Sequence, residues 1–278
     1  MITITGATGN VGTEAVRLLA AAGEPVRAFA RRPPTHPTED VDVVTGDLDD
    51  PLAVARAVEG ASTVVLVSPA VPRQEIAVID AAVAAGVGHL VKISSKASPH
   101  SPVDRRRGQA TIEAHLRESG LAWTIVRSNA YMQNILAFGP SVRADREIVM
   151  SAGDGEVGMI DAHDVAAVAA VIAQNPAAHV GRTYWPTGPA LLTYDDVADA
   201  LSEVVGQSVT HRRVESDEHR RSMLAAGLPE QVAGSNADAF RLIGEGDAAW
   251  ITDDVEVLTG SEPGTVRDFL SRNRAAFV

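Results

Sequence analysis

The sequence predicts an α/β fold built on a doubly wound parallel sheet, and three observations lead to this prediction. Short β-branched segments alternate with alanine-rich amphipathic segments through the first half of the chain, which is typical of a parallel sheet with helices on both faces. A glycine-rich turn joins the first strand to the first helix. The length of 278 residues also allows a core that buries about three quarters of the unfolded surface.

Six segments of the first half have the composition of buried strands. They are residues 1–5, 25–30, 41–46, 62–67, 88–94 and 121–126. The stretch between the first two strands predicts a helix, because Val11, Ala15 and Leu19 fall on one stripe. Gly23 suits the C-terminal end of that helix. After about residue 130 the alternation breaks, and a helix over residues 193–206 is mixed with isolated strands and turns.

Composition excludes several kinds of site. Without cysteine there is no thiolate metal site, and the eight histidines have no ligand spacing, so we expect no metal. The net charge of −12 repels phosphate backbones and disfavours nucleic-acid binding, in spite of the basic stretch Asp104–Gln109. The apolar runs are far shorter than the ~20 residues that cross a membrane. With no leader before the first strand, we expect a cytoplasmic protein without a membrane segment.

The glycine turn "ITITGATGNVGTEAV" has the spacing of a dinucleotide-binding loop. Gly6 would permit the tight turn, Gly9 the approach of the backbone to a pyrophosphate, and Gly12 the packing of helix on strand. The helix start adds free amides and a positive dipole end. The predicted phosphate-binding residues are Gly6, Thr8, Gly9, Asn10, Val11 and Gly12. The alternative is a glycine turn that binds nothing.

The ends of the second and third strands are expected to meet the adenosine half of the cofactor. Arg31 and Arg32 stand where an acidic residue would bind a 2′-hydroxyl and an arginine a 2′-phosphate. They favour NADP, with NAD as the alternative, unless they are a solvated pair before a proline-rich loop. Asp47 and Leu48 are expected to contact the adenine by a hydrogen bond and an apolar surface.

The ends of the fourth and fifth strands are expected to meet the rest of the cofactor, since ligands lie outside the carboxyl ends of such strands. Ser68 and Pro69 should reach its middle. Ser94 and Ser95 should border the nicotinamide and its ribose.

The only two lysines of the chain, Lys92 and Lys96, lie beside these serines. An extended backbone separates them by roughly 13 Å, at about 3.3 Å per residue, so one small site cannot hold both. We expect a structural role for Lys92, which lies inside the strand. Lys96 follows the strand end, where an ammonium could bind the ribose or polarise a substrate oxygen. Arginine-favouring codon usage is the alternative explanation for both positions.

Five stretches together resemble the NmrA-like branch of the atypical short-chain dehydrogenases over nearly the whole chain. They are "TGATGNVG", "GDLDD", "ESGLAWTIVRSNAYMQNI", "GMIDAHDVA" and "YWPTGPALLTYDDVADALSEVVGQ". The resemblance implies a Rossmann-type core and NADPH-dependent quinone or azo-dye reduction, tailoring of aromatic polyketides, or dinucleotide sensing without turnover. It also places Asn129 and Tyr131 near the nicotinamide. Tyr131 is then the phenol expected to contact the substrate, and ordinary packing is the alternative explanation for it.

We therefore expect two parts in the chain. Residues 1–130 are predicted to form the NAD(P)-binding Rossmann core. Residues 131–278 are predicted to return partly to this core and otherwise to form a small α/β substrate lobe.

The usual catalytic pair of short-chain dehydrogenases, Tyr-x-x-x-Lys, is missing, because no tyrosine is followed by lysine four residues on. The corresponding helical turn carries Gln109 and Glu113, which offer no acid suited to neutral pH. This disfavours an ordinary carbonyl reductase and leaves Lys96 and Tyr131 as the catalytic candidates.

The favoured function is hydride transfer from NAD(P)H to a quinone or an aromatic, polyketide-like acceptor. Such an acceptor delocalises the incoming charge, so positioning and a modest electrostatic contact can suffice. One alternative is a tailoring monooxygenase or hydroxylase-type enzyme, and another is a non-catalytic redox sensor. The expected partner is a small aromatic molecule, and a homodimer is compatible with the sequence.

Overall fold

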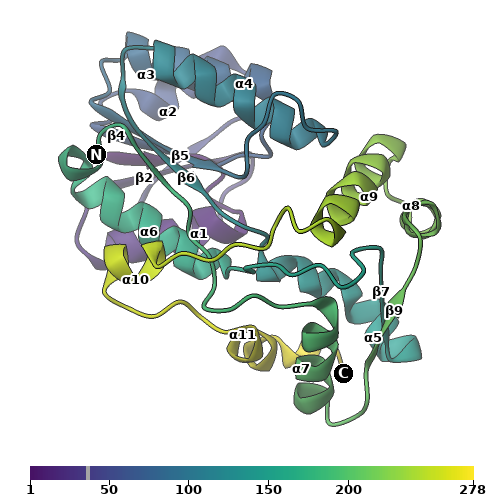
Figure 1. The fold of residues 1–278 in the computed structure, drawn as a ribbon. Helices are drawn as coiled ribbons and strands as arrows, with labels where there is room; N and C mark the ends of the chain where they lie inside the picture. The colour runs from purple at the N-terminus through teal and green to yellow at the C-terminus, as the bar shows by residue number, and fades with distance from the viewer. Residues whose placement is uncertain (36–37) are drawn as a thin grey trace.

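The computed structural model describes residues 1–35 and 38–278 of the chain (Figure 1). Within these residues the larger sheet has seven strands in the order β3-β2-β1-β4-β5-β6-β8, all paired in parallel. Its strands are β1 (Ile2–Ile4), β2 (Val26–Ala30), β3 (Asp42–Thr45), β4 (Thr63–Leu66), β5 (His89–Ser94), β6 (Ala122–Arg127) and β8 (Arg182–Tyr184). The first five lie within the predicted segments and β6 ends one residue beyond its segment, and the predicted doubly wound sheet is confirmed.

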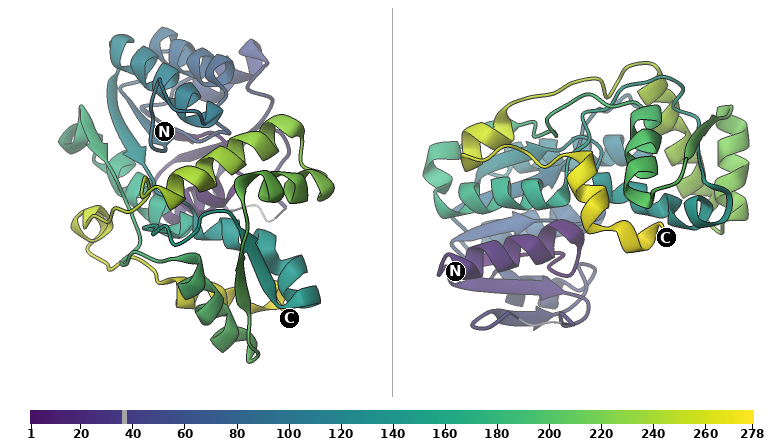
Figure 2. Two further views of the ribbon diagram at one scale, coloured as in Figure 1. Left: turned by 45° about the vertical axis from the view of Figure 1, so that its right-hand side comes forward. Right: turned by 90° about the horizontal axis from the view of Figure 1, so that it is seen from below.

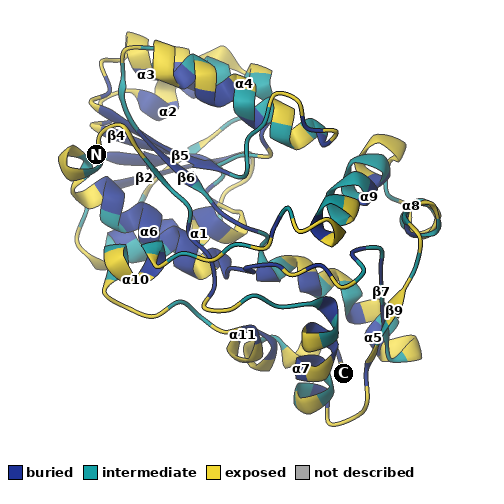
Figure 3. Ribbon diagram, viewed as in Figure 1, coloured by how far each residue is buried: buried dark blue, intermediate teal, exposed yellow. Residues whose placement is uncertain are grey.

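Helices cover both faces of this sheet and turn their buried sides toward it (Figures 1 and 3). One face holds α1 (Asn10–Ala21) and α6 (Ala162–Gln174), and the other holds α2 (Pro51–Val58), α3 (Pro72–Ala84) and α4 (Asp104–Glu118). The predicted stripe of α1 is buried at Val11, Ala15 and Leu19. Gly23 follows the helix with a φ of +79°, as expected for the residue that ends it.

The second half of the chain adds a lobe with its own apolar core. Its small parallel sheet pairs β7 (Glu147–Met150) with β9 (Thr210–Arg213). Its helical elements are η1 (Met132–Phe138), α5 (Gly139–Asp145), α7 (Tyr194–Val205), α8 (Ser216–Ala225), α9 (Glu230–Gly244), α11 (Val266–Arg272) and η3 (Arg274–Ala276). Buried Met132, Ile148, Leu201 and Phe277 belong to one cluster that joins these elements.

Other parts of the second half pack on the sheet of the first half. They are α6, η2 (Pro176–His179), β8 and α10 (Asp254–Thr259). Val255 of α10 belongs to the same buried cluster as Ile4 of β1. A division near residue 130 stays our proposal for the two parts of the chain.

The strand order places the site, because the sheet is wound in opposite directions from β1 and from β4. Ligands of such sheets bind in the crevice at this switch point, outside the carboxyl ends of the strands. Thr5 and Val67 tie the two strand ends together through two hydrogen bonds of 2.8 Å at the Thr5 hydroxyl. The lobe lies beyond the same ends of the sheet (Figures 1 and 2), so we expect a ligand at the switch point to have both parts of the chain beside it.

Residues 1–35 and 38–278 contain neither a membrane-spanning helix nor a metal-binding cluster. No helix in these residues combines the length and the apolar character needed to span a membrane. The same residues hold no group of three or more His, Cys, Asp or Glu side chains arranged to bind a metal ion.

Candidate active site

Two glycines of the β1–α1 loop lie where a side chain would not fit. Gly6 has a φ of +58°, and a Cβ there would lie 2.6 Å from the carbonyl oxygen of Val67. A Cβ at Gly12 would lie 2.2 Å from the carbonyl oxygen of Gly6. The loop therefore depends on glycine to keep β1, α1 and the end of β4 in close contact.

The start of α1 follows this loop with its first amides directed away from the helix. Gly9 is the N-cap residue and donates its own amide to Gly6 over 2.9 Å. No side chain among the described residues caps the helix, so the amides of Asn10 and Val11 are available to a ligand. Free amides and the positive dipole end together suit a pyrophosphate. Thr8 is exposed beside them.

The predicted adenosine-binding residues lie at the ends of β2 and β3. Arg31 and Arg32 directly follow β2, and both are exposed. Asp47 is exposed after β3, while Leu48 is half-buried against the sheet core. Their contacts with a cofactor stay predictions.

At the end of β4, the Ser68 side chain is hydrogen-bonded to one member of a buried ion pair. Its hydroxyl donates to Glu75 Oε1 of α3 over 2.7 Å and accepts the amide of Ala70 over 3.1 Å. The other carboxylate oxygen lies 2.9 Å from Lys92 Nζ, and neither charged side chain has any exposed surface. The structural role predicted for Lys92 is confirmed. Pro69 is exposed next to Ser68, and the cofactor contacts of both residues stay predictions.

At the end of β5, the Ser94 hydroxyl donates to Glu113 of α4 over 2.7 Å. The fully buried carboxylate also binds Arg127 of β6, with Nε at 2.9 Å, and Arg117, at 3.0 Å. Burial alone would raise the pKa of Glu113, but the hydrogen bonds from both guanidinium groups and the serine lower it overall. Glu113 is therefore an anion at neutral pH, and the Ser94 hydroxyl is already engaged when a cofactor arrives.

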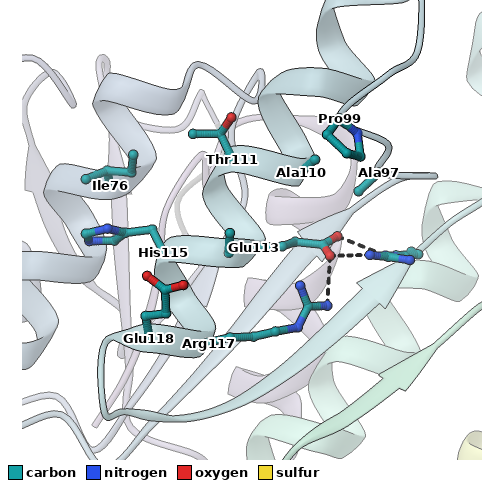
Figure 4. A pocket seen from close by; sticks show the side chains of 11 residues that line it. Ile76, Ala97, Pro99, Ala110, Thr111, Glu113, His115, Arg117 and Glu118 are labelled. Atoms are coloured by element: carbon teal, nitrogen blue, oxygen red, sulfur yellow. Dashed lines mark hydrogen bonds and ion pairs between the residues drawn. The ribbon is translucent and has the colours of Figure 1, made fainter.

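This carboxylate also faces a groove of about 650 Å³ beside α4 (Figure 4). Its lining includes Ile76, Thr111 and His115 and no residue of the glycine loop. Figure 4 shows Arg117 turned toward Glu113, and Arg127 binds the same carboxylate, so each of these charged groups already has a partner in the protein. We therefore interpret this cluster as structural, because it connects β5, β6 and α4.

Two polar atoms near the same strand end have no hydrogen-bond partner among the described residues. They are Ser95 Oγ and Gln109 Oε1, both buried. A buried polar atom without a partner costs about 1–3 kcal/mol, so such atoms mark places where a ligand or water can bind. Ser95 thus fits its predicted position beside the nicotinamide, and that contact stays a prediction.

Lys96 is engaged by the lobe. Its ammonium lies 2.7 Å from Asp247 Oδ1 and donates to the Asp247 carbonyl oxygen over 2.8 Å. Arg106 of α4 binds the second carboxylate oxygen at 2.6 Å. Two of the three ammonium donors are therefore used by the segment after α9, and a catalytic role for Lys96 stays untested.

Asn129 and Tyr131 follow β6, and their side chains differ in how far they are engaged by other residues. Asn129 donates to the carbonyl of Ala248 over 3.0 Å and accepts the amide of Ala130 over 2.8 Å, so its amide group is engaged by protein. Tyr131 is half-buried against the sheet core. Burial raises the pKa of the Tyr131 phenol, although the Ser128 hydroxyl and the charge of Arg105 act in the opposite direction.

Sequence reasoning missed Glu75 and Asp247, the partners of the two lysines. Glu75 had one usable signal, since a charged residue at an inward position of an apolar helix needs a buried partner. Asp247 had none, because it lies 151 residues from Lys96 in the chain.

The strand order, the glycine loop and the free amides of α1 define a dinucleotide-binding protein with a Rossmann-type sheet. The model of the NmrA-like family matches residues 1–270, and the chain belongs to this family.

Individual relatives agree with this assignment over full length. An NAD(P)H azoreductase of Xenophilus azovorans is 34% identical over 284 aligned positions, covering 100% of this chain and 99% of the relative. A (4-alkanoyl-5-oxo-2,5-dihydrofuran-3-yl)methyl phosphate reductase of Streptomyces griseus is 37% identical over 283 positions, with the same coverage. The crystal structure of an NADPH-dependent quinone oxidoreductase of Escherichia coli in complex with NADPH is 26% identical, with a TM-score of 0.89 and coverage of 99% and 100%.

Proposed function

We propose that the protein is an NAD(P)H-dependent oxidoreductase that reduces a quinone or another conjugated aromatic acceptor by hydride transfer. The observation that carries the proposal is the glycine cradle at the β1–β4 switch point, which leaves the amides of Asn10 and Val11 free for a pyrophosphate. The reductases among the full-length relatives support reduction in preference to hydroxylation. NADP is the preferred cofactor, because the exposed side chains of Arg31 and Arg32 directly follow β2, where an arginine suits a 2′-phosphate.

The residues of this chain then bind and orient the reactants. Bound NADPH supplies the hydride. Tyr131 can hydrogen-bond an acceptor oxygen, since its raised pKa keeps the phenol protonated at neutral pH. Glu113 is ionised and held by its partners, so it does not act as the acid. A quinone suits such a site because it spreads the incoming charge over its own ring.

Steady-state oxidation of NADPH tests the proposal. A quinone and an azo dye should be reduced, and a simple ketone should react at least about a hundredfold more slowly in kcat/KM, which corresponds to about 2.7 kcal/mol of barrier. Titration with both cofactors should give tighter binding of NADPH than of NADH, and equal affinities would contradict the preference for NADP.

A dinucleotide sensor is the second candidate function. It is favoured by the engagement of Lys96 with Asp247, which leaves few free catalytic groups at the strand ends. Tight NADPH binding without turnover of any quinone or azo acceptor would support the sensor. We propose a cytoplasmic location for the protein, whether it is a reductase or a sensor. Light scattering of the purified chain can measure whether it forms a homodimer.

A further inference from the structure

The start of α4 and the loop before it carry a group of cations, one of which has no acidic partner among the described residues. The group consists of Lys96, Arg105, Arg106 and Arg107. Asp247 binds the first and third of these, and Asp104 binds the fourth. Arg105 forms no ion pair with any residue in the described part of the chain, and its side chain is exposed.

The helical repeat shows where Arg105 points. Gln109, Ile112 and Leu116 follow it at spacings of four, seven and eleven residues, and all three are buried. Ile112 and Leu116 pack in the same cluster as strands β4, β5 and β6. Residues at these spacings share a helix face, so Arg105 lies on the face that covers the sheet. It stands one turn before Gln109, in the first turn of α4, which begins after the carboxyl end of β5.

Tyr131 lies close enough to Arg105 for the two groups to interact through their charges. The guanidinium lowers the pKa of the Tyr131 phenol, against the larger effect of burial. Surrounding protein lowers the pKa of Arg105, followed by the charge of Arg106, while Tyr131 raises it. The side chain thus keeps access to solvent but is partly desolvated. An unpaired cation in such a place gains more from a bound anion than one in open solvent.

The lobe is bound to the start of α4 and to the loop before it. Gln231 at the start of α9 donates to Asp104 over 3.0 Å. Asp247, after the end of α9, binds Lys96 and Arg106. Both ends of α9 are therefore bonded to α4, which carries Arg105, or to the loop between β5 and α4. Figure 1 shows α9 beside this loop.

We propose that Arg105 selects acceptors that carry an anionic group, a carboxylate, phosphate or sulfonate, next to the conjugated ring. The inference rests on the proposed function, because it places the acceptor at the nicotinamide end of the crevice. The phosphates of the cofactor do not explain this cation, since their predicted sites are the β1–α1 loop and the pair Arg31 and Arg32. A planar guanidinium can bind such an oxyanion through two hydrogen bonds. With a net charge of −12, the rest of the chain would otherwise repel it.

The test compares two acceptors that differ in one anionic group, 1,4-naphthoquinone and 1,4-naphthoquinone-2-sulfonate. Each is assayed with the wild type and the variants Arg105→Gln, Arg105→Lys and Arg107→Gln. In Arg105→Gln, the rise in KM for the sulfonate should exceed the rise for the neutral quinone by about tenfold or more. Arg105→Lys should restore part of this difference, because it keeps the charge without the fork. Arg107→Gln is the control, since that cation is paired with Asp104.

For each acceptor, the KM of a variant is divided by the KM of the wild type. The two resulting ratios are then compared, so the difference in reactivity between the quinones cancels. Equal rises for both acceptors in Arg105→Gln would overturn the proposal. The same result in Arg107→Gln as in Arg105→Gln would also overturn it, because a general change of surface charge would then explain both.

Binding of the sulfonated quinone to the NADP⁺-loaded protein, measured by calorimetry, separates this inference from the proposed function. If neither quinone is reduced but sulfonate binding weakens about tenfold in Arg105→Gln, the proposed function fails and the anion site stands. If binding is unchanged in Arg105→Gln, the anion site is wrong whatever the turnover. Thermal unfolding of each variant checks that the fold is intact.

Discussion

Lys92 and Glu75 form an ion pair with no exposed surface. Each charge loses several kcal/mol of hydration when it is buried, and only close partners offset that loss. Here the two charges lie 2.9 Å apart, the ammonium also donates to the Ile93 carbonyl, and Ser68 donates to the carboxylate. One of the two lysines is therefore explained without catalysis, because it joins α3 and the β4 loop to β5.

Lys92→Met should destabilise the protein strongly, since it leaves the Glu75 carboxylate buried without its counter-charge. We expect a loss of about 3–5 kcal/mol in the free energy of unfolding, measured by urea titration. An apolar side chain of similar length keeps the packing, so the charge is the main quantity changed.

The double variant Glu75→Gln with Lys92→Met is the matched control. It removes both charges and keeps a carbonyl oxygen that can accept the Ser68 hydroxyl. Most of the lost stability should return, because replacing a whole buried pair is often neutral. A double variant as unstable as Lys92→Met alone would show that packing, and not charge, causes the loss.

At the scale of elements, the sequence predicted what strong periodicity and topology determine. The strands β1 to β6 are rich in β-branched residues and, apart from the exposed edge strand β3, mostly buried, which made their segments recognisable. The three-residue β8 and the polar strand β9, with the residues THRR, have no such pattern. Their pairing depends on neighbours far away in the chain, which a single segment does not reveal.

Gly12→Ala tests the junction between β1 and α1. The added Cβ would lie 2.2 Å from the Gly6 carbonyl oxygen, so the helix must move away from the loop. We expect NADPH affinity to fall by about tenfold or more, measured by titration of the bound cofactor's fluorescence.

Gly234→Ala is the control for this substitution. Gly234 lies inside α9, and a Cβ there would meet no atom within 4 Å. Alanine should leave NADPH affinity unchanged and raise stability by about 0.5–1 kcal/mol. A loss of affinity in both variants would contradict a specific role for the Gly12 contact.

Glu113 joins three elements and should make their packing sensitive to acid. Its folded-state pKa is lowered from the ordinary value of 4.5, because its hydrogen bonds outweigh burial. The charged form therefore contributes stability above the unfolded-state pKa, and this contribution is lost as the pH falls through the lower folded-state pKa. The stability difference between wild type and Glu113→Gln should be full at pH 7 and shrink below about pH 4.5. A difference that stays constant with pH in urea titrations would rule out the ionised carboxylate as its source.

At the scale of the whole molecule, the site is completed by residues that are distant in the chain. The sequence placed Ser68, Ser94 and Ser95 at strand ends because the carboxyl ends of parallel strands meet at one edge. It did not reveal that Ser94 is engaged by Glu113, or that Lys96 is held by Asp247. The first pairing arises when α4 packs on β5 and the second when the lobe docks on the sheet, and no local pattern encodes either.

The interaction of Lys96 with Asp247 decides whether the second lysine is catalytic or holds the lobe. Asp247 also binds Arg106, so Asp247→Ala should lower kcat/KM at least as much as Lys96→Ala if both act by fastening the lobe. In that case, adding Lys96→Ala to Asp247→Ala should cause no further loss beyond about twofold, because the contact is already absent. We expect this outcome, since Asp247 occupies two of the three ammonium donors. A further loss of about tenfold in the Asp247→Ala background would instead mean that the ammonium acts on the acceptor or the ribose, about 1.4 kcal/mol of transition-state stabilisation that no lobe contact explains.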